Sequence, residues 1–261
     1  MPLRSFAIGA AGEELYPRFV SELAEKLDDS SVDRNRLVRD VLAQLYLGRT
    51  VDHDALVADP SVPLATRTLV ASFDPRNGTL EAEYYREIDL EKWARVKPLL
   101  WFWQMFDHSP VGRNVRLGTQ MRFMLAKRTF RHCGDRVRIF HDCEFSFGYN
   151  LTVGNGVTIH RNVLIDDRGE VVIGDDASIS DYANIYSHGH AVEDIHDVSL
   201  AKTEIGARAR ITYHSVILSG VKVADDAIVG SMGVASKAVE RGWIVGGIPA
   251  KLIAQRTLKG P

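Results

Sequence analysis

The sequence has few cysteines, almost no net charge and no long apolar run. Its two cysteines, Cys133 and Cys143, are too few for a disulfide framework, so a reducing, cytoplasmic setting is expected. The 32 Lys and Arg residues nearly balance the 34 Asp and Glu residues, which gives no electrostatic reason to expect a nucleic-acid partner. No apolar stretch approaches the roughly 18 residues that a membrane span needs, so no membrane partner is expected.

Two kinds of motif are also missing. The apolar stretch from Phe6 to Gly12 is short, and Glu13 and Glu14 follow it directly, so we expect no secretory signal peptide. No glycine-rich phosphate-binding loop of the Walker or GxGxxG type occurs. That absence argues against nucleotide hydrolysis and against dinucleotide binding.

The first half of the chain has the apolar pattern of helices. Apolar residues recur at steps of four from Leu15 to Leu27, which predicts one apolar stripe along a helix. Asp33 is the candidate N-cap of a second helix, and Gly48 lies just past its end. A Trp-rich helix is expected over residues 89–106, with a break or kink at Pro98.

From about Cys133 the pattern changes to a repeat of six residues. Hexads such as VGNGVT, IHRNVL, IGARAR and ILSGVK begin with an aliphatic residue and carry a small or β-branched residue at the fifth position. A repeat at fixed spacing outranks local propensity as a guide to the fold. The first positions are Cys133, Ile139, Val153, Ile159, Ile165, Ile173, Ile179, Ile185, Ile205, Ile211, Ile217, Val223 and Val229.

This repeat predicts a β-solenoid. Each hexad suits a short strand followed by a tight turn, in which Gly, Asp or Asn accepts an unusual backbone angle. Three such units close one triangular coil, and the first-position residues then stack in ladders inside the prism. Neighbouring coils pair their backbones and bury each other's interior faces. About five coils are expected, and the chain past Ile248 is expected to fold back or to form a short helix.

The second half resembles the left-handed parallel β-helix of the hexapeptide-repeat acyltransferases. The resemblance rests on NIYSHGH at 184–190, on the gap that follows, on ITYHSVILSGVKVADDAIVGSMGVASK at 211–237 and on GGIPAKLI at 246–253. Within the family the chain looks like the maltose and galactoside O-acetyltransferases, over roughly Val111 to Arg256. The expected fold is mainly β: the apolar pattern predicts an N-terminal α-helical domain at 1–110, and the resemblance implies a left-handed β-helix domain with a C-terminal tail at 111–261. The helical half matches these enzymes poorly.

The His-rich stretch Asn184 to Asp197 contains His188, His190 and His196. The repeat is lost between about Ala191 and Thr203, and loops that leave a regular scaffold commonly carry function. By resemblance, Gly189-His190 matches the family's general base, which deprotonates the acceptor hydroxyl. Histidine suits that task because it titrates near neutral pH. The hydroxyl then attacks a thioester directly, without a covalent enzyme intermediate and without a metal.

A metal site is the second interpretation of the same stretch. His188 and His190 share one face of an extended strand, which is usable ligand spacing. The γ-class carbonic anhydrases hold zinc with three histidines on this fold, and His160 or His196 is the candidate third ligand. The bordering residues match the acyltransferases instead, so no metal is expected. His188 either orients His190 or lines the cleft, and His196 has the pattern of a solvated loop residue.

Further site residues follow from the resemblance. His160 stands where the family places an active-site Asn. Asp166 and Asp167, in the interruption LIDDRG, match an Asp pair that contacts a sugar acceptor, since carboxylates accept hydrogen bonds from hydroxyls. For each, an ordinary turn residue is the competing interpretation. The residues that match the family's coenzyme A contacts are Tyr213, Ser231, Ser236, Lys237 and Lys251.

The expected function is transfer of an acetyl group from acetyl-CoA to a hydroxyl of a sugar or glycan precursor. The expected assembly is a homotrimer with the active site between subunits. Three alternatives remain open: N-acetylation of an amino sugar, a zinc lyase like the γ-class carbonic anhydrases, and a non-catalytic β-helix scaffold.

Overall fold

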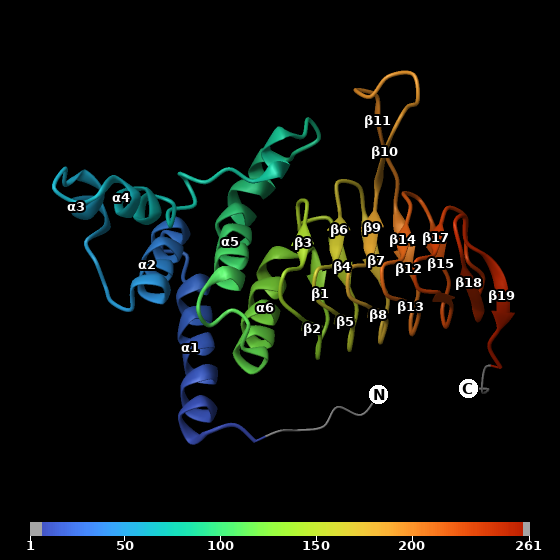
Figure 1. Ribbon diagram of the computed structural model, residues 1–261, viewed down its shortest axis with the longest axis horizontal. Coiled ribbons are helices and arrows are strands. Elements are labelled where there is room, and N and C mark those ends of the chain that lie inside the picture. The colour runs from blue at the N-terminus through green and yellow to red at the C-terminus, as the bar shows by residue number, and fades with distance from the viewer. Residues whose placement is uncertain (1–6, 258–261) are drawn as a thin grey trace.

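The structure is a computed structural model that describes residues 7–257. Phe6, the first residue of the apolar stretch considered as a signal peptide, lies outside the described residues. A helical region leads into a long parallel β-solenoid (Figure 1). The helical elements are α1 (Ala10–Asp28), α2 (Arg34–Leu47), α3 (His53–Ala58), α4 (Leu64–Ala71), the 3-10 helix η1 (Glu81–Tyr84), α5 (Leu90–His108) and α6 (Val115–Thr129).

The first two expected helices form where the sequence indicates. Leu23 and Leu27 of α1 are buried. The Asp33 side chain accepts hydrogen bonds from the first backbone N–H groups of α2, which satisfies donors that have no partner inside the helix. Gly48 ends α2 with φ 68°, the left-handed conformation that glycine adopts without a steric penalty.

The Trp-rich helix differs from the prediction. Helix α5 runs unbroken through Pro98, so the expected break is wrong. Pro98 and its neighbours Leu99 and Leu100 are buried, and we attribute the continuity to this packing, which offsets the lost backbone hydrogen bond. Helix α6, which the sequence analysis did not anticipate, carries the helical region beyond residue 110 to Thr129. No helix among residues 7–257 is long and apolar enough to cross a membrane.

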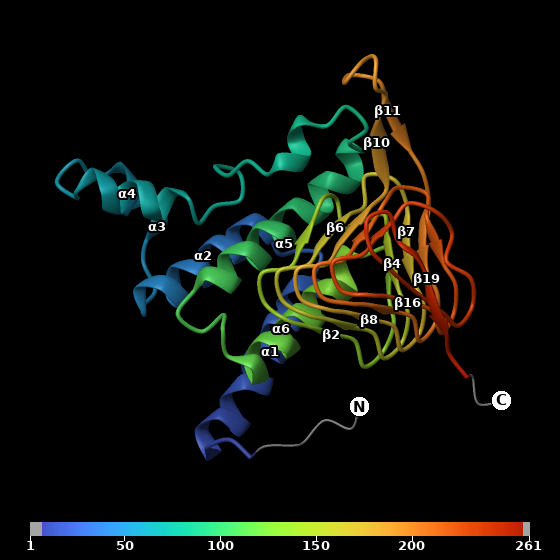
Figure 2. The same ribbon diagram turned by 45° about the vertical axis from the view of Figure 1, so that its right-hand side comes forward.

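The solenoid has three parallel sheets, which form the faces of a prism (Figure 2). The first face contains β1 (His132–Cys133), β4 (Leu151–Val153), β7 (Val171–Ile173), β12 (Thr203–Ile205) and β15 (Lys222–Val223). The second contains β2 (Arg138–Ile139), β5 (Thr158–Ile159), β8 (Ser178–Ile179), β13 (Arg210–Ile211), β16 (Ile228–Val229), β18 (Trp243–Gly246) and β19 (Lys251–Gln255). The third contains β3 (Glu144–Phe145), β6 (Leu164–Asp166), β9 (Asn184–Tyr186), β14 (Val216–Ile217) and β17 (Val234–Ala235).

The predicted ladders are confirmed. On the first face, Cys133 pairs with Val153, Val153 with Ile173, Ile173 with Ile205 and Ile205 with Val223. The first-position residues of the hexads are all buried. The strands complete five turns and β18 begins a sixth. After Ile248 the chain folds back as β19, antiparallel to β18, so the fold-back is confirmed and the short helix is wrong.

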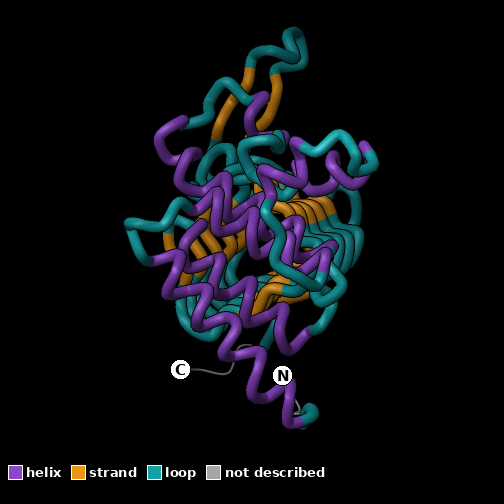
Figure 3. The backbone as a smooth tube through the Cα atoms, turned by 90° about the vertical axis from the view of Figure 1, so that its left-hand side faces the viewer, coloured by secondary structure: helices purple, strands orange, loops and turns teal. Residues whose placement is uncertain are grey.

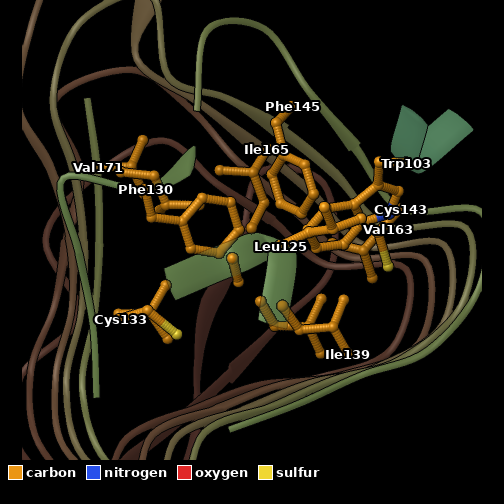
Figure 4. Close-up of a cluster of buried hydrophobic side chains, with 14 of the residues drawn as sticks. Trp103, Leu125, Phe130, Cys133, Ile139, Cys143, Phe145, Val163, Ile165 and Val171 are labelled. Atoms are coloured by element: carbon orange, nitrogen blue, oxygen red, sulfur yellow. The ribbon is translucent and has the colours of Figure 1, made fainter. Parts of the chain in front are cut away.

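The helices cover the open end of the first coil, as the view in Figure 3 shows. Trp103 of α5 lies 5.2 Å from Phe145 of the solenoid, measured between ring centroids. Phe130, just past α6, lies 4.9 Å from Phe145. Leu125 and Ile139 complete the contact between the helical region and the solenoid interior (Figure 4). This aromatic cluster closes the hydrophobic core at that end.

Three edges join the three faces, and most of the candidate site residues lie at these edges. The chain turns at the first edge after the strands of the first face, at the second edge after the strands of the second face, and at the third edge after the strands of the third face. Turn residues with positive φ include Asn162 and Asp176, which are of the predicted types, but also Tyr182 and His214. The rings of Tyr182 and His214 stack 4.7 Å apart at the second edge. This stacking offsets part of the cost of a left-handed conformation in a bulky residue.

Candidate active site

A pocket of about 830 Å³ lies at the third edge. Three segments enclose it: the outer side of the solenoid, residues 81–87 of the helical region, and a hairpin that leaves the solenoid. Its lining residues are Glu81, Tyr84, Tyr85, Arg86, Glu87, Ser146, Leu164, Asp166, Arg168, Tyr186, His188, His190, Ile195, His196, Asp197, Val198 and Leu200. The pocket therefore brings all three histidines of the His-rich stretch together with residues of the helical region.

The hairpin forms where the six-residue repeat is lost. Strands β10 (His188–His190) and β11 (Val198–Leu200) pair antiparallel, with His190 opposite Val198. The hairpin projects away from the prism (Figure 1), and Val192 and Ile195 at its loop are exposed. At β12 the chain returns to the first face.

His190 is exposed and its ring is held from one side. Its Nδ1 lies 2.6 Å from the backbone oxygen of Ile195 in the hairpin loop. A carbonyl oxygen accepts but cannot donate, so Nδ1 carries the proton of this hydrogen bond. In the neutral ring, Nε2 then has a free lone pair, which is the state a general base needs.

His188 is held in the same way by a carboxylate. Its Nδ1 hydrogen-bonds to Oδ2 of Asp166, and only 18% of its side chain is exposed. Asp166 is buried, and its Oδ1 accepts hydrogen bonds from Ser146 Oγ at 3.0 Å and from the Arg168 backbone N–H at 3.3 Å. The rings of His188 and His190 are perpendicular, with centroids 5.2 Å apart. The Asp166 carboxylate thus reaches the pocket wall but already has protein partners.

Asp167 does not lie where the sequence analysis expected it. Its carboxylate is fully buried and accepts hydrogen bonds from the backbone N–H groups of Phe147, at 2.8 Å, and Asn150, at 3.1 Å. The interruption LIDDRG turns this side chain inward, toward backbone donors of the preceding coil. Burial raises the pKa of Asp167 to about 6, although the backbone hydrogen bonds oppose the rise. The carboxylate holds the turn together and does not line the pocket.

His160 lies at a different edge. It follows β5, at the second edge, where its ring stacks on Phe140 with centroids 5.2 Å apart. Within one chain it does not line the pocket that contains His188 and His190. Among residues 7–257, no group of three or more His, Cys, Asp or Glu side chains is placed to hold a metal ion. The third ligand that the zinc interpretation requires is therefore not supplied by His160 of the same chain.

The candidate coenzyme A residues are spread over the solenoid. Tyr213 and Ser231 are in turns of the second edge, after β13 and β16. Ser236 and Lys237 follow β17, at the third edge, and Lys251 begins β19. All five side chains are exposed. One chain does not gather them into a single pocket.

Several residues of the pocket were missed by the sequence analysis. The buried Arg168 guanidinium donates to a carboxylate oxygen of Glu87 and lies 4.0 Å from the ring centroid of Tyr85. Burial is the largest single influence and opposes ionisation of Glu87, but the hydrogen bonds from Arg168 and the backbone, together with nearby positive charge, outweigh it and keep the pKa of Glu87 below its usual value. The two-residue interruption of the repeat was a usable signal for Arg168. No sequence pattern marks residues 81–87, because their contacts with the solenoid are long-range.

Comparisons with known proteins agree with this architecture. No protein-family model matches the chain. Galactoside O-acetyltransferase of Escherichia coli strain K12 is 27% identical over 172 residues, which cover 63% of this chain and 79% of that protein. A dTDP-4-amino-4,6-dideoxy-D-glucose acyltransferase of Escherichia coli is 27% identical over 166 residues, which cover 57% of this chain and 83% of that protein.

The fold has a counterpart among solved structures. A galactoside acetyltransferase in complex with coenzyme A superposes with a TM-score of 0.57 at 24% identity, over 74% of this chain and 91% of that one. The solenoid is thus the left-handed parallel β-helix that the resemblance implied. By its six-residue repeat, this fold and its similarity to two named acyltransferases, the chain is similar to the hexapeptide-repeat acyltransferases, among them a galactoside O-acetyltransferase.

Proposed function

We propose that the protein transfers an acetyl group from acetyl-CoA to a hydroxyl group of a sugar or glycan precursor, with His190 as the general base. The observation that carries the proposal is the orientation of His190. Its Nδ1 is engaged by the Ile195 carbonyl, and its ring lines a pocket large enough for a sugar. The similarity to a galactoside O-acetyltransferase supports a sugar-like acceptor.

The proposed acetyl transfer needs one side chain that first accepts a proton and then returns it. The thioester of acetyl-CoA supplies the acetyl group, and its thiolate is the leaving group. His190 Nε2 takes the proton of the acceptor hydroxyl while the acceptor oxygen bonds to the acetyl carbon. When the bond from carbon to sulfur breaks, the imidazolium returns that proton to the departing sulfur. The products are the acetyl ester and free coenzyme A, and His190 is regenerated without a covalent enzyme intermediate.

The proposed assembly is a homotrimer with active sites between subunits. Tyr213, Ser231 and His160 are at the second edge, whereas His190 and Lys237 are at the third. An arrangement that sets the second edge of one copy against the third edge of its neighbour would unite these candidates in one groove. The exposed lysines suit a ligand that carries several phosphates. The two cysteines are free and buried, which fits the cytoplasmic setting proposed for the enzyme.

N-acetylation of an amino sugar is the second candidate function. The similarity to a dTDP-4-amino-4,6-dideoxy-D-glucose acyltransferase favours it. The same histidine can accept a proton from an attacking amine. A thiol-release assay with acetyl-CoA, run across neutral sugars, nucleotide sugars and amino sugars, separates the two acceptor classes by which compounds react.

The test of the mechanism is His190→Ala. Turnover is expected to fall at least ~100-fold, because a general base contributes about that much, while the Kd of coenzyme A measured by calorimetry stays nearly unchanged. Unchanged turnover would remove His190 from the role. Failure of the wild-type protein to bind coenzyme A would instead favour a non-catalytic scaffold. Stoichiometric zinc in the purified protein would favour the lyase alternative.

A further inference from the structure

The pocket contains two imidazole rings that are fixed in the same protonation pattern. His190 Nδ1 faces the Ile195 carbonyl, and His188 Nδ1 faces the Asp166 carboxylate. Both partners are acceptors, so in each neutral ring the proton is on Nδ1 and the lone pair is on Nε2. The pocket wall therefore carries two hydrogen-bond acceptors on one short strand, with ring centroids 5.2 Å apart.

The Asp166 carboxylate is a support and not a ligand for the acceptor. Besides His188, it receives hydrogen bonds from Ser146 Oγ, the Arg168 N–H and the Ser187 N–H. Its side chain is only 5% exposed. A carboxylate with this many protein donors has little capacity left for a substrate hydroxyl. The Asp166 carboxylate fixes the tautomer and the orientation of the His188 ring, as hydrogen-bond partners on the far ring nitrogen do for metal-binding histidines.

We propose that His188 contacts the acceptor directly, and that His188 and His190 together select molecules with two neighbouring hydroxyl groups. This inference rests on the proposed acyl transfer and names the substrate class of the same site. One hydroxyl donates to His190 Nε2 and is the one that reacts. The adjacent hydroxyl donates to His188 Nε2 and fixes the orientation of the acceptor. Vicinal diols, such as those of pyranose rings, have this arrangement, and an isolated alcohol does not.

The physical expectation is a contribution to binding and orientation. When an acceptor molecule fills the pocket, an Nε2 lone pair that meets no donor is shielded from water and left unsatisfied, which makes the pocket discriminate against molecules lacking the second hydroxyl. His188 therefore affects KM for a diol and the fraction of bound diol in a reactive pose. It has no such effect on an alcohol with a single hydroxyl, which meets His190 alone.

Two substitutions separate this role from a structural one. In His188→Asn the side-chain amide N–H replaces Nδ1 and keeps the hydrogen bond to Asp166, but nothing replaces Nε2. In His188→Gln the longer side chain places an amide near the Nε2 position, with an oxygen able to accept. The Asn variant is expected to lose the diol preference, and the Gln variant to retain part of it. Thermal denaturation of both variants checks that the fold is intact.

The experiment compares trans-cyclohexane-1,2-diol with cyclohexanol as acceptors in the thiol-release assay. Wild-type kcat/KM is expected to be at least ~10-fold higher for the diol than for cyclohexanol, which is about the effect of one additional hydrogen bond between the acceptor and a polar group of the protein. His188→Asn should reduce the preference to about 2-fold or less through KM for the diol, with a clearly smaller loss of kcat/KM for cyclohexanol than for the diol. A preference that survives His188→Asn, or an equal loss for both alcohols, overturns the inference.

A second measurement keeps the inference separate from the proposed function. Long-range ¹H–¹⁵N spectra of the imidazoles report which ring nitrogen of His188 carries the proton, and addition of the diol should shift the His188 Nε2 signal. If no acceptor reacts although coenzyme A binds, acyl transfer fails as a proposal, and these spectra decide the diol contact independently. A proton found on Nε2 of neutral His188, or no response to the diol, overturns the inference.

Discussion

The hydrogen-bond partner of each polar side chain determines what that side chain can do. Asp166 and Asp167 are adjacent and chemically identical, yet one supports His188 at the pocket wall and the other is enclosed by backbone donors. The sequence predicted both as acceptor ligands, because their place in an interruption of the repeat marks the region but not the direction of a side chain. His190 and His188 were predicted as pocket residues because an ordered repeat ends beside them. The supporting contacts of Ser146 and Ile195 had no sequence signal of their own.

The buried Asp167 carboxyl is expected to make stability depend on pH. Its pKa is about 6 in the folded protein, raised by burial, against about 4 for an unfolded Asp. The folded state thus holds the proton more tightly, so this residue's contribution to stability is complete below about pH 4 and is lost as pH rises through about 6. Relative to Asp167→Asn, the wild-type free energy of unfolding should fall by ~1–3 kcal/mol between pH 4 and pH 7.

Urea denaturation of both proteins at several pH values measures this difference. The comparison with Asp167→Asn cancels the pH dependence of the other titrating groups. The amide retains one acceptor oxygen for the backbone donors, so the variant is expected to fold. A difference in unfolding free energy that stays constant from pH 4 to pH 7 would contradict the assignment of a raised pKa to Asp167.

Among the elements, the solenoid strands were the most predictable part of the fold. Each strand contributes only two to a few residues, but a fixed spacing repeated over many turns identifies the interior positions. Helix α6 and the continuity of α5 through Pro98 were not predicted, since burial against the first coil determines both and the sequence pattern does not display that contact. The hairpin was predicted only as a break. Its antiparallel pairing became visible in the structure.

The hairpin loop is expected to serve activity more than stability. Replacing residues 191–197 with an Asn-Gly turn would join His190 to Val198, which already face each other across the hairpin, and Asn-Gly suits a two-residue turn. The removed residues are mostly exposed, so the melting temperature should change by only a few degrees. Turnover should fall by about 10-fold or more, because His190 loses the Ile195 carbonyl that orients it.

A matched control keeps the backbone contact. Ile195→Ala retains the carbonyl oxygen and shortens only an exposed side chain at the pocket, so its turnover should fall much less than that of the shortened hairpin. Steady-state rates with acetyl-CoA and a reactive acceptor compare the two variants. Wild-type turnover in the shortened hairpin would show that His190 needs no support from the loop.

At the scale of the whole molecule, one buried ion pair joins the helices to the solenoid. Arg122 of α6 donates from Nε to Asp107 of α5 at 2.7 Å and from Nη2 to the Gly112 carbonyl at 2.6 Å. The other Asp107 oxygen accepts from the backbone N–H of Asp142, at the second edge of the solenoid, at 2.8 Å. Burial raises the pKa of Asp107, and Arg122 opposes that rise. The pair thus connects three segments that no sequence pattern associates.

Removing one partner of this pair should cost much more than replacing both. Arg122→Met leaves the Asp107 carboxylate buried without its cation, and a loss of about 3–5 kcal/mol in the free energy of unfolding is expected at pH 7. The double substitution Arg122→Met with Asp107→Leu removes both charges and leaves only the Asp142 N–H and the Gly112 carbonyl without these partners, so its loss should be smaller. Urea denaturation of the two single variants and the double variant gives the coupling energy. A cost below about 1 kcal/mol for Arg122→Met would mean that water or another side chain compensates Asp107, and that other contacts, such as those of Trp103 with Phe145, are enough to hold the helical region on the solenoid.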